Sequence, residues 1–347
     1  MIALFAAMAL GYEPPLDRGD GWSVAHAADV GMDPAVLDAL SAADWGDVHT
    51  IHVARHGKLV FESADRPGRL EQPHDLRSAT KSITSLLVLD AVQRGELGLE
   101  DPVLGHLQVQ ATDPRWSALT VDHLLSMRSG LHCDDRERRT PGFEDRMYRS
   151  RDWLAFWLAV PFARDPGTDA HYCTGNVVAL GRVLEGATGR GIPSIAAERL
   201  FGPLGITDAT WATYDRGAGT DTGGHLRLLP RDFAKIGQLA LDRGRWGGEQ
   251  VLTEGAVDAA LTHQTTIDGG ASYGRLWWHA AAVADGVRHE VWFASGNGGQ
   301  YVFVVPDLDL TATFTGGAYN RPEAGIPFEL LGRYVLAAAA EASAAGR

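Results

Sequence analysis

Two side chains three residues apart, Ser78 and Lys81, carry the strongest chemical signal in the sequence. They open an apolar stretch that runs to Gln93 and has the pattern of a buried helix. Residues three apart on a helix share one face, about 5 to 6 Å apart at Cβ, so the lysine amine can reach the serine hydroxyl. We expect burial to lower the pKa of Lys81, which lets the amine accept or relay the proton that Ser78 loses when it attacks a carbonyl. The spacing therefore predicts nucleophilic catalysis by a serine.

Composition and charge exclude several other classes of function for the chain. The chain has 347 residues, 45% of them apolar, and only three lysines, at positions 58, 81 and 235. A net charge of −13 disfavours binding to nucleic acid or to an anionic membrane surface. No apolar run is long enough to predict a membrane span, and no nucleophile-elbow, Walker or zinc-protease motif occurs. A solvated serine and lysine in a first helical turn is the alternative to catalysis.

The elements that must position the pair follow a clear order along the chain. Helical periodicity predicts helices at 33–43, 78–93, 231–242 and 327–342. Strands are predicted at 48–54, 58–62, 274–279, 289–293, 300–305 and 310–315, the last three as an antiparallel meander. Residues 101–225 show helical periods without convincing strands. We therefore expect an α/β domain, an antiparallel sheet flanked by helices, from residues 17–100 and 226–347, with a mostly helical domain inserted at 101–225.

The N-terminus and the two cysteines do not decide the cellular location of the protein. Residues 1–16 contain an apolar run with Ala7-Met8-Ala9, which resembles a truncated export signal without a basic start. Cys133 and Cys173 could be free thiols or one bridge that closes a loop of about forty residues. A periplasmic or secreted location and a cytoplasmic location both stay open, and so does the oligomeric state.

At Ser78 the chain resembles the serine hydrolases of the class C β-lactamase and penicillin-binding-protein-like family, which includes family VIII-type esterases and 6-aminohexanoate-oligomer-hydrolase-like enzymes. The resemblance runs from about Gly21 to about Asn320. It is carried by HDLRSATK at 74–81, HLLSMRSGL at 123–131, PLGI at 203–206 and NGGQ at 297–300. It implies a β-lactamase/transpeptidase-like fold and acyl-enzyme chemistry that needs no cofactor and no metal.

The family's second motif, Tyr-x-Asn or Tyr-x-Ser, is matched by Tyr172-Cys173-Thr174. By resemblance, Tyr172 shares proton transfer with Lys81, whose positive charge is expected to lower the pKa of the phenol. Thr174 departs from the motif but keeps a hydroxyl that could hydrogen-bond a substrate. The alternative is that Tyr172 is an amphipathic residue at an interface.

The third motif, Lys-Thr-Gly in β-lactamases, is degenerate here. Its best match is Ala294-Ser295-Gly296, and the residues expected to bind substrate or to form the oxyanion hole are Ser295, Gly296, Asn297 and Gly298. The last lysine of the chain is Lys235, which we interpret as a surface cation on an amphipathic helix. Because the motif lysine of the relatives helps to bind a substrate carboxylate, its loss favours an ester or an uncharged amide.

We therefore predict a serine hydrolase that acts on a small ester, amide or lactam, with an ester or amide favoured. A β-lactamase or D-amino-acid peptidase is the alternative among enzymes, and a non-catalytic binding protein that keeps the fold is the alternative outside them.

Three further features admit two interpretations each. The charged run at 134–139 is read as a solvated loop, or as a rim that selects charged substrates. His225 could line a cleft or mark a crossover between domains. The tryptophans Trp277, Trp278 and Trp292 could line an apolar pocket or pack in the core.

Overall fold

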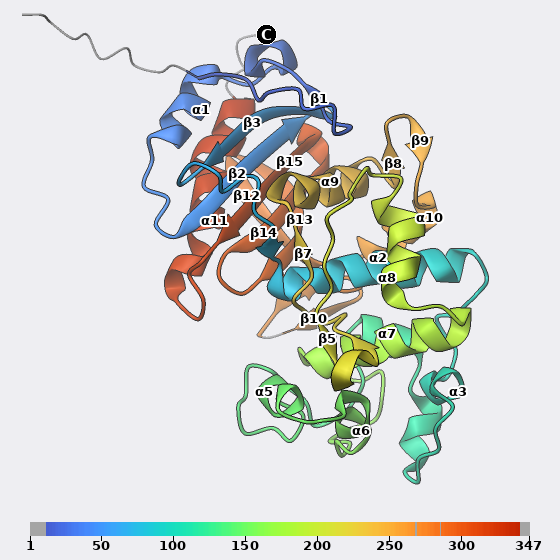
Figure 1. The fold of residues 1–347 in the computed structure, drawn as a ribbon. Helices are drawn as coiled ribbons and strands as arrows, with labels where there is room; N and C mark the ends of the chain where they lie inside the picture. Colours follow the sequence, from blue (N-terminus) through green and yellow to red (C-terminus); the bar gives the residue numbers. More distant parts are fainter. Residues whose placement is uncertain (1–11, 268, 285, 341–347) are drawn as a thin grey trace, which may run out of the picture.

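A nine-stranded sheet organises one half of the molecule (Figure 1). The computed structural model describes residues 12–340 except residues 268 and 285. The strand order is β1-β3-β2-β15-β14-β13-β12-β11-β10, and the described pairs are antiparallel except β1 beside β3. The strands are β1 (Ser23–Val24), β2 (Val48–Arg55), β3 (Lys58–Ala64), β10 (Thr265–Ile267), β11 (Ala271–Tyr273), β12 (Trp278–Ala284), β13 (Val287–Gly296), β14 (Gln300–Val305) and β15 (Leu310–Gly316). Short two-stranded ladders join β4 (His74–Asp75) to β7 (Arg227–Leu228), β5 (Thr213–Tyr214) to β6 (Gly219–Thr220) and β8 (Arg245–Trp246) to β9 (Glu249–Gln250).

The predicted hairpin of β2 and β3 and the meander of β13, β14 and β15 are confirmed. The strand predicted at 274–279 is misplaced, because β12 begins only at Trp278. The Gly274 amide donates to the Trp277 carbonyl at 2.8 Å, which makes this segment a turn. Its apolar residues Leu276 and Trp277 are buried. The residues of this segment are apolar because they are buried, and the strand begins only after the turn, at Trp278.

One face of the sheet is covered by helices from the two ends of the chain (Figure 1). Helix α1 (Pro34–Ser41) starts at Asp33, whose carboxylate accepts a hydrogen bond from the Ala35 amide at 2.7 Å and caps the helix. The C-terminal helix begins as α11 (Ile326–Leu330), continues through a wider π-type turn at Leu331–Leu336 and is described as far as residue 340. Its predicted last residues, 341 and 342, lie outside the described residues.

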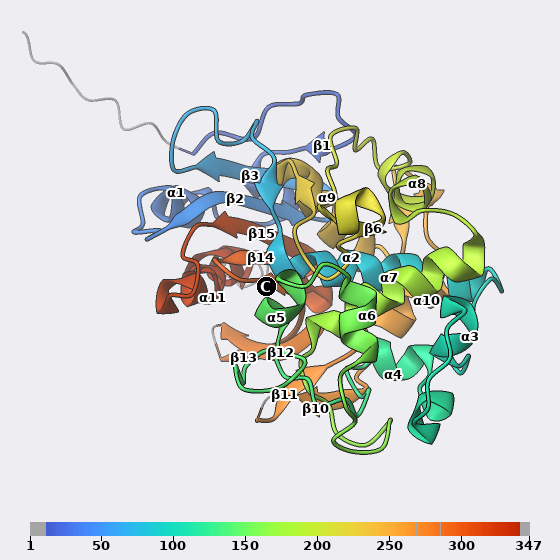
Figure 2. The ribbon, with the colours of Figure 1, turned by 60° about the horizontal axis from the view of Figure 1, so that its bottom comes forward.

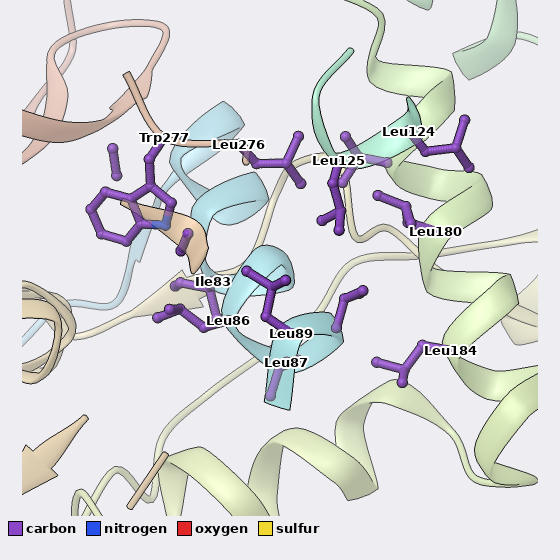
Figure 3. Packing of buried hydrophobic residues seen from close by; sticks show 14 of the residues in the cluster. Ile83, Leu86, Leu87, Leu89, Leu124, Leu125, Leu180, Leu184, Leu276 and Trp277 are labelled. Carbon is purple, nitrogen blue, oxygen red and sulfur yellow. The ribbon is translucent and has the colours of Figure 1, made fainter. Parts of the chain in front are cut away.

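The opposite face of the sheet packs on α2 (Thr80–Gln93) and α9 (Pro230–Leu241). Figure 3 shows Ile83 and Leu86 of α2 beside Trp277, while leucines of α4 (Val121–Leu125) and α7 (Thr174–Thr188) approach α2 from the other side. Each fully buried aliphatic side chain contributes roughly 1.5–3 kcal/mol. Because α2 is enclosed on all sides, it is apolar almost all round, as the sequence predicts.

The remaining helices gather around α7 and α2 (Figure 2). They are α3 (Val103–Leu107), α5 (Glu144–Tyr148), α6 (Trp153–Leu158), α8 (Ile192–Ala196) and α10 (Glu254–Ala260). One buried core joins α2 and α7 to β14, and the domain boundaries at residues 100/101 and 225/226 stay a prediction. Within the described ranges, none of the helices has the length and apolar character needed to cross a lipid bilayer.

Lys235 on α9 is buried, so its interpretation as a surface cation is wrong. Its ammonium lies 2.8 Å from the carboxylate of Asp232, one turn earlier on the helix. The segments that carry Trp22 and Trp246 pack on α9 beside Ala234. They cover a side of the helix that helical periodicity predicts to be exposed.

Candidate active site

Ser78 lies in a short 3-10 turn, Arg77–Ala79, that leads directly into α2. Lys81 is in the first turn of the helix, and its Nζ donates to Ser78 Oγ at 3.0 Å. Ser78 is partly exposed, whereas Lys81 is only 1% exposed. The amine therefore reaches the hydroxyl from beneath, as the three-residue spacing predicts.

Lys81 Nζ also donates to the Gly223 carbonyl oxygen at 2.6 Å, and it lies 5.1 Å from the centroid of the Tyr172 ring. Burial lowers the pKa of Lys81, but nearby Tyr172, Glu144 and Asp135 favour the ammonium, so the net pKa is raised. The predicted lowering of the Lys81 pKa is therefore wrong, because two acidic residues come close only in the folded chain.

Tyr172 lies just before α7, and its ring packs beside the ammonium of Lys81. Its ring lies 5.1 Å from Lys81 Nζ and stacks on Trp278 with the ring centroids 5.7 Å apart. Ser78 and Tyr172 line the same cavity, and both lie beside the Lys81 ammonium. The structure thus brings the three residues proposed for catalysis together.

These groups open on a cavity of about 430 Å³. A cavity of this size fits a small molecule. Its lining residues are Ser78, Asp135, Arg136, Glu144, Tyr172, Trp278, Ser295 and Asn297. Of the three tryptophans considered, Trp278 lines the cavity and Trp277 is fully buried in the core.

Asp135 and Glu144 form an acidic pair that the sequence analysis missed. The Asp135 carboxylate accepts from the Glu144 amide at 2.9 Å and from the Thr174 amide at 2.5 Å. Burial, and then the charge of Glu144, raise the pKa of Asp135 to about 7, although Lys81 opposes the rise. Asp135 belongs to the run 134–139, which the sequence reads as a solvated loop or as a rim that selects charged substrates, and its place in the cavity lining agrees with the second reading. The signal that could have found it is its position two residues after Cys133.

Thr174 does not line the cavity, so its predicted contact with substrate is wrong in this structure. The residue is fully buried, and its hydroxyl donates to Glu144 Oε2 at 2.8 Å. Of the two interpretations of the cysteines, the bridge is the one observed: Cys133 and Cys173 form a disulfide across 40 residues. The bridge and Thr174 together hold the Asp135 loop against Tyr172.

The degenerate third motif forms the opposite wall. Ser295 and Asn297 line the cavity. Ser295 lies opposite Tyr301 of the neighbouring strand, and Asn297 Nδ2 donates to Asn320 at 2.9 Å. Gly296 lets β13 approach the nucleophile turn, since a Cβ there would lie 2.2 Å from the Leu76 carbonyl oxygen. Gly298 occupies a turn with φ 95° against Tyr319 and is not among the lining residues.

A buried carboxylate fixes the loop that receives Lys81. Asp221 Oδ1 accepts from the amides of Gly223 and Gly224 at 3.1 and 2.9 Å. Its Oδ2 lies 2.8 Å from His225 Nδ1, and His225 Nε2 lies 3.0 Å from Arg77 Nη1. The bond to Asp221 raises the pKa of His225. His225 therefore connects Asp221, which holds the Gly223 loop, to Arg77 of the nucleophile turn, and it does not line the cavity.

The chain resembles known proteins in sequence and in fold. The family model described as Beta-lactamase matches residues 40–325. Esterase EstB of Burkholderia gladioli is 31% identical over 176 residues, 45% of this chain and 45% of that protein, so the match spans less than half of the esterase. Penicillin-binding protein 4 of Amycolatopsis lactamdurans is 28% identical over 302 residues, 74% of this chain and 75% of that protein.

A solved structure shows the same fold. A penicillin-binding-protein homologue from Caulobacter crescentus superposes with a TM-score of 0.68 at 17% identity, covering 89% of this chain and 97% of the other. The predicted combination of an antiparallel sheet, flanking helices and further helices on one side is thus confirmed. Since the family model spans most of the sequence, the chain belongs to the β-lactamase family.

Proposed function

We propose that this enzyme hydrolyses an ester or an uncharged amide through an acyl-enzyme formed on Ser78. The observation that supports this most directly is the 3.0 Å contact from Lys81 Nζ to Ser78 Oγ at the base of the cavity. Ala294 stands where β-lactamases carry the lysine of the third motif, and no lysine follows Lys235. A substrate carboxylate therefore lacks that partner, which favours an ester or amide without a free carboxylate.

In the proposed reaction, Ser78 Oγ forms a bond to the substrate carbonyl carbon while its proton passes to the Lys81–Tyr172 pair. The tetrahedral intermediate then expels the alcohol or amine, which takes that proton. Water repeats the sequence and releases the acid. Because the surroundings of Lys81 favour its ammonium form, we assign electrostatic stabilisation to Lys81 and proton transfer to Tyr172.

Two backbone amides would stabilise the oxyanion. We assign one to Ser78, just before the N-terminus of α2, and the other to the segment from Ser295 to Gly298 at the end of β13. Gly296 supports this assignment because its missing side chain lets that segment approach the nucleophile turn. Loss of one such donor typically costs ~10²- to 10³-fold in rate.

The test is a panel of short acyl esters, anilides and β-lactams assayed on the wild type, on Ser78→Ala and on Ser117→Ala, an exposed serine of the helical part. We expect ester or anilide turnover that falls at least ~10³-fold in Ser78→Ala and is unchanged in Ser117→Ala. A serine-reactive phosphonate should add its mass to Ser78. A cephalosporin hydrolysed as fast as the best ester would reverse the substrate ranking, and a folded protein that resists the phosphonate would indicate a binding protein.

A further inference from the structure

We propose that the substrate carries a positively charged group, which is held by the Glu144 carboxylate and the Trp278 ring. This inference rests on the proposed function, because it concerns the substrate of the same cavity. A ligand is expected here because the Ser78–Lys81 pair opens on the cavity that Glu144 and Trp278 line. The acidic pair by itself would not indicate a site.

Glu144 has an oxygen to offer to a ligand. Among the described residues, both hydrogen bonds to its carboxylate end on Oε2, from Thr174 Oγ1 at 2.8 Å and from Tyr148 Oη at 3.4 Å. These bonds orient the carboxylate and leave Oε1 for a ligand. Asp135 differs, because each of its two oxygens already accepts a backbone amide. We therefore assign binding to Glu144 and positioning to Asp135.

The buried cation of the site does not compete for this role. Lys81 donates hydrogen bonds to Ser78 and to the Gly223 carbonyl, and its ammonium lies beside the Tyr172 ring. Its ammonium therefore lies beneath the cavity, and the Glu144 carboxylate can accept a second cation from the substrate side.

Trp278 supplies an aromatic face that already accepts a cation. The guanidinium carbon of Arg136, an exposed residue at the rim, lies 5.6 Å from the centroid of the Trp278 ring. Cations within about 6 Å of an aromatic centroid are attracted to the ring face. The Tyr172 ring also stacks on Trp278. A substrate ammonium in the cavity would lie between this aromatic wall and Glu144.

Matched substrate pairs that differ only in charge test the proposal. For the leaving group, the pair is hexanoylcholine and its neutral isostere 3,3-dimethylbutyl hexanoate. For the acyl group, the pair is the 5-aminopentanoyl and the hexanoyl 4-nitroanilide. We expect at least ~10-fold higher kcat/KM for the charged member of one pair. The pair that shows the preference identifies the side of the scissile bond that carries the cation.

The Glu144→Gln variant tests the assigned partner. We expect the charged-to-neutral ratio of kcat/KM to fall to about two or less. A purely structural or catalytic role of Glu144 would lower both members of a pair alike and leave the ratio unchanged. The control is Asp145→Asn, which removes the same charge at the neighbouring carboxylate, whose side chain is 42% exposed, and should keep the wild-type ratio.

The outcomes separate this inference from the proposed function. Hydrolysis of the neutral compounds with no charge preference in the wild type overturns the inference alone, whether or not Glu144→Gln folds. A preference that survives in folded Glu144→Gln also overturns it. Failure to hydrolyse all four compounds, together with failure of the phosphonate to label Ser78, overturns the proposed function itself.

Discussion

The Gly223 carbonyl oxygen lies 2.6 Å from Lys81 Nζ, closer than the Ser78 hydroxyl at 3.0 Å. A carbonyl can only accept, so one ammonium proton stays on this bond and another faces the Ser78 hydroxyl. The position of Lys81 therefore depends on a loop 142 residues later in the chain as well as on its own helix.

This dependence predicts a defect in Asp221→Asn. The NH2 group of the new asparagine would face either His225 Nδ1 or the two loop amides that now donate hydrogen bonds to the carboxylate. Because one of these interactions is lost, the Gly223 carbonyl should shift. We expect kcat to fall by ~10- to 10²-fold with a small change in KM, because misplacement of a reacting group mainly slows chemistry. Asp208→Asn, an exposed acid of the helical part, is the control. A variant with wild-type kcat would show that the loop does not position Lys81.

Removal of the disulfide should affect both stability and activity. The bridge closes a 40-residue loop, for which the chain-entropy model gives about 4 kcal/mol. We expect Cys133→Ala/Cys173→Ala to lose a comparable free energy of unfolding in a denaturant titration. Its kcat/KM should fall because the Asp135 loop is no longer tied beside Tyr172. Reductant should lower the wild-type activity and leave that of the double variant unchanged; a wild type that is reduced but fully active contradicts this role.

The acidic pair predicts a pH-dependent contribution to stability. In the folded protein the pKa of Asp135 is raised to about 7 from 3.8, so between these values the folded state holds a proton that the unfolded chain has lost. The stability from protonated Asp135 is complete below about pH 4 and is lost as the pH rises to about 7.

Asp135→Asn cannot lose this proton. The difference in Tm between variant and wild type should therefore move in favour of the variant from about pH 4.5 to about pH 7.5. Asp145→Asn should show no such trend. A difference for Asp135→Asn that stays constant over this range would mean that Asp135 is ionised throughout.

A methyl group at position 296 should disturb the nucleophile turn. The Cβ of Gly296→Ala would lie 2.2 Å from the Leu76 carbonyl oxygen, and both groups belong to the backbone. We expect a loss of roughly 1–3 kcal/mol in the free energy of unfolding and at least a ~10-fold loss of kcat/KM. Gly332→Ala is the matched control, because apart from its own stretch of helix the new Cβ would meet no atom within 4 Å. Full activity in Gly296→Ala would show that the close approach of β13 to the nucleophile turn is not needed for activity.

Sequence reasoning found the parts of the site that local spacing determines. The Ser78–Lys81 contact follows from helical periodicity, and the β2–β3 hairpin and the final meander follow from alternating runs between turns. Tyr172 was located by resemblance, because its contact with Lys81 joins segments 91 residues apart, the difference between 172 and 81.

The remainder depended on tertiary proximity. The pKa of Lys81 was predicted in the wrong direction because Glu144 and Asp135 approach it only after the helical part folds onto α2. Thr174 was assigned to the substrate because nothing in its sequence neighbourhood shows that Glu144 takes its hydroxyl. Lys235 was assigned to the surface because a single helix cannot show what packs on its outer side.

The parallel pairing of β1 with β3 bears on how the protein is best produced. The Tyr12 hydroxyl donates to the Val60 carbonyl of β3, and the Ala27 amide donates to that hydroxyl. Residues 12–27 thus lie over a strand that would otherwise form the border of the sheet. Trimming the chain beyond Val24 would leave β3 with unpaired backbone groups, and bare strand borders promote association between copies. An expression variant shortened in this way should precipitate or form oligomers more readily than one that begins before Tyr12.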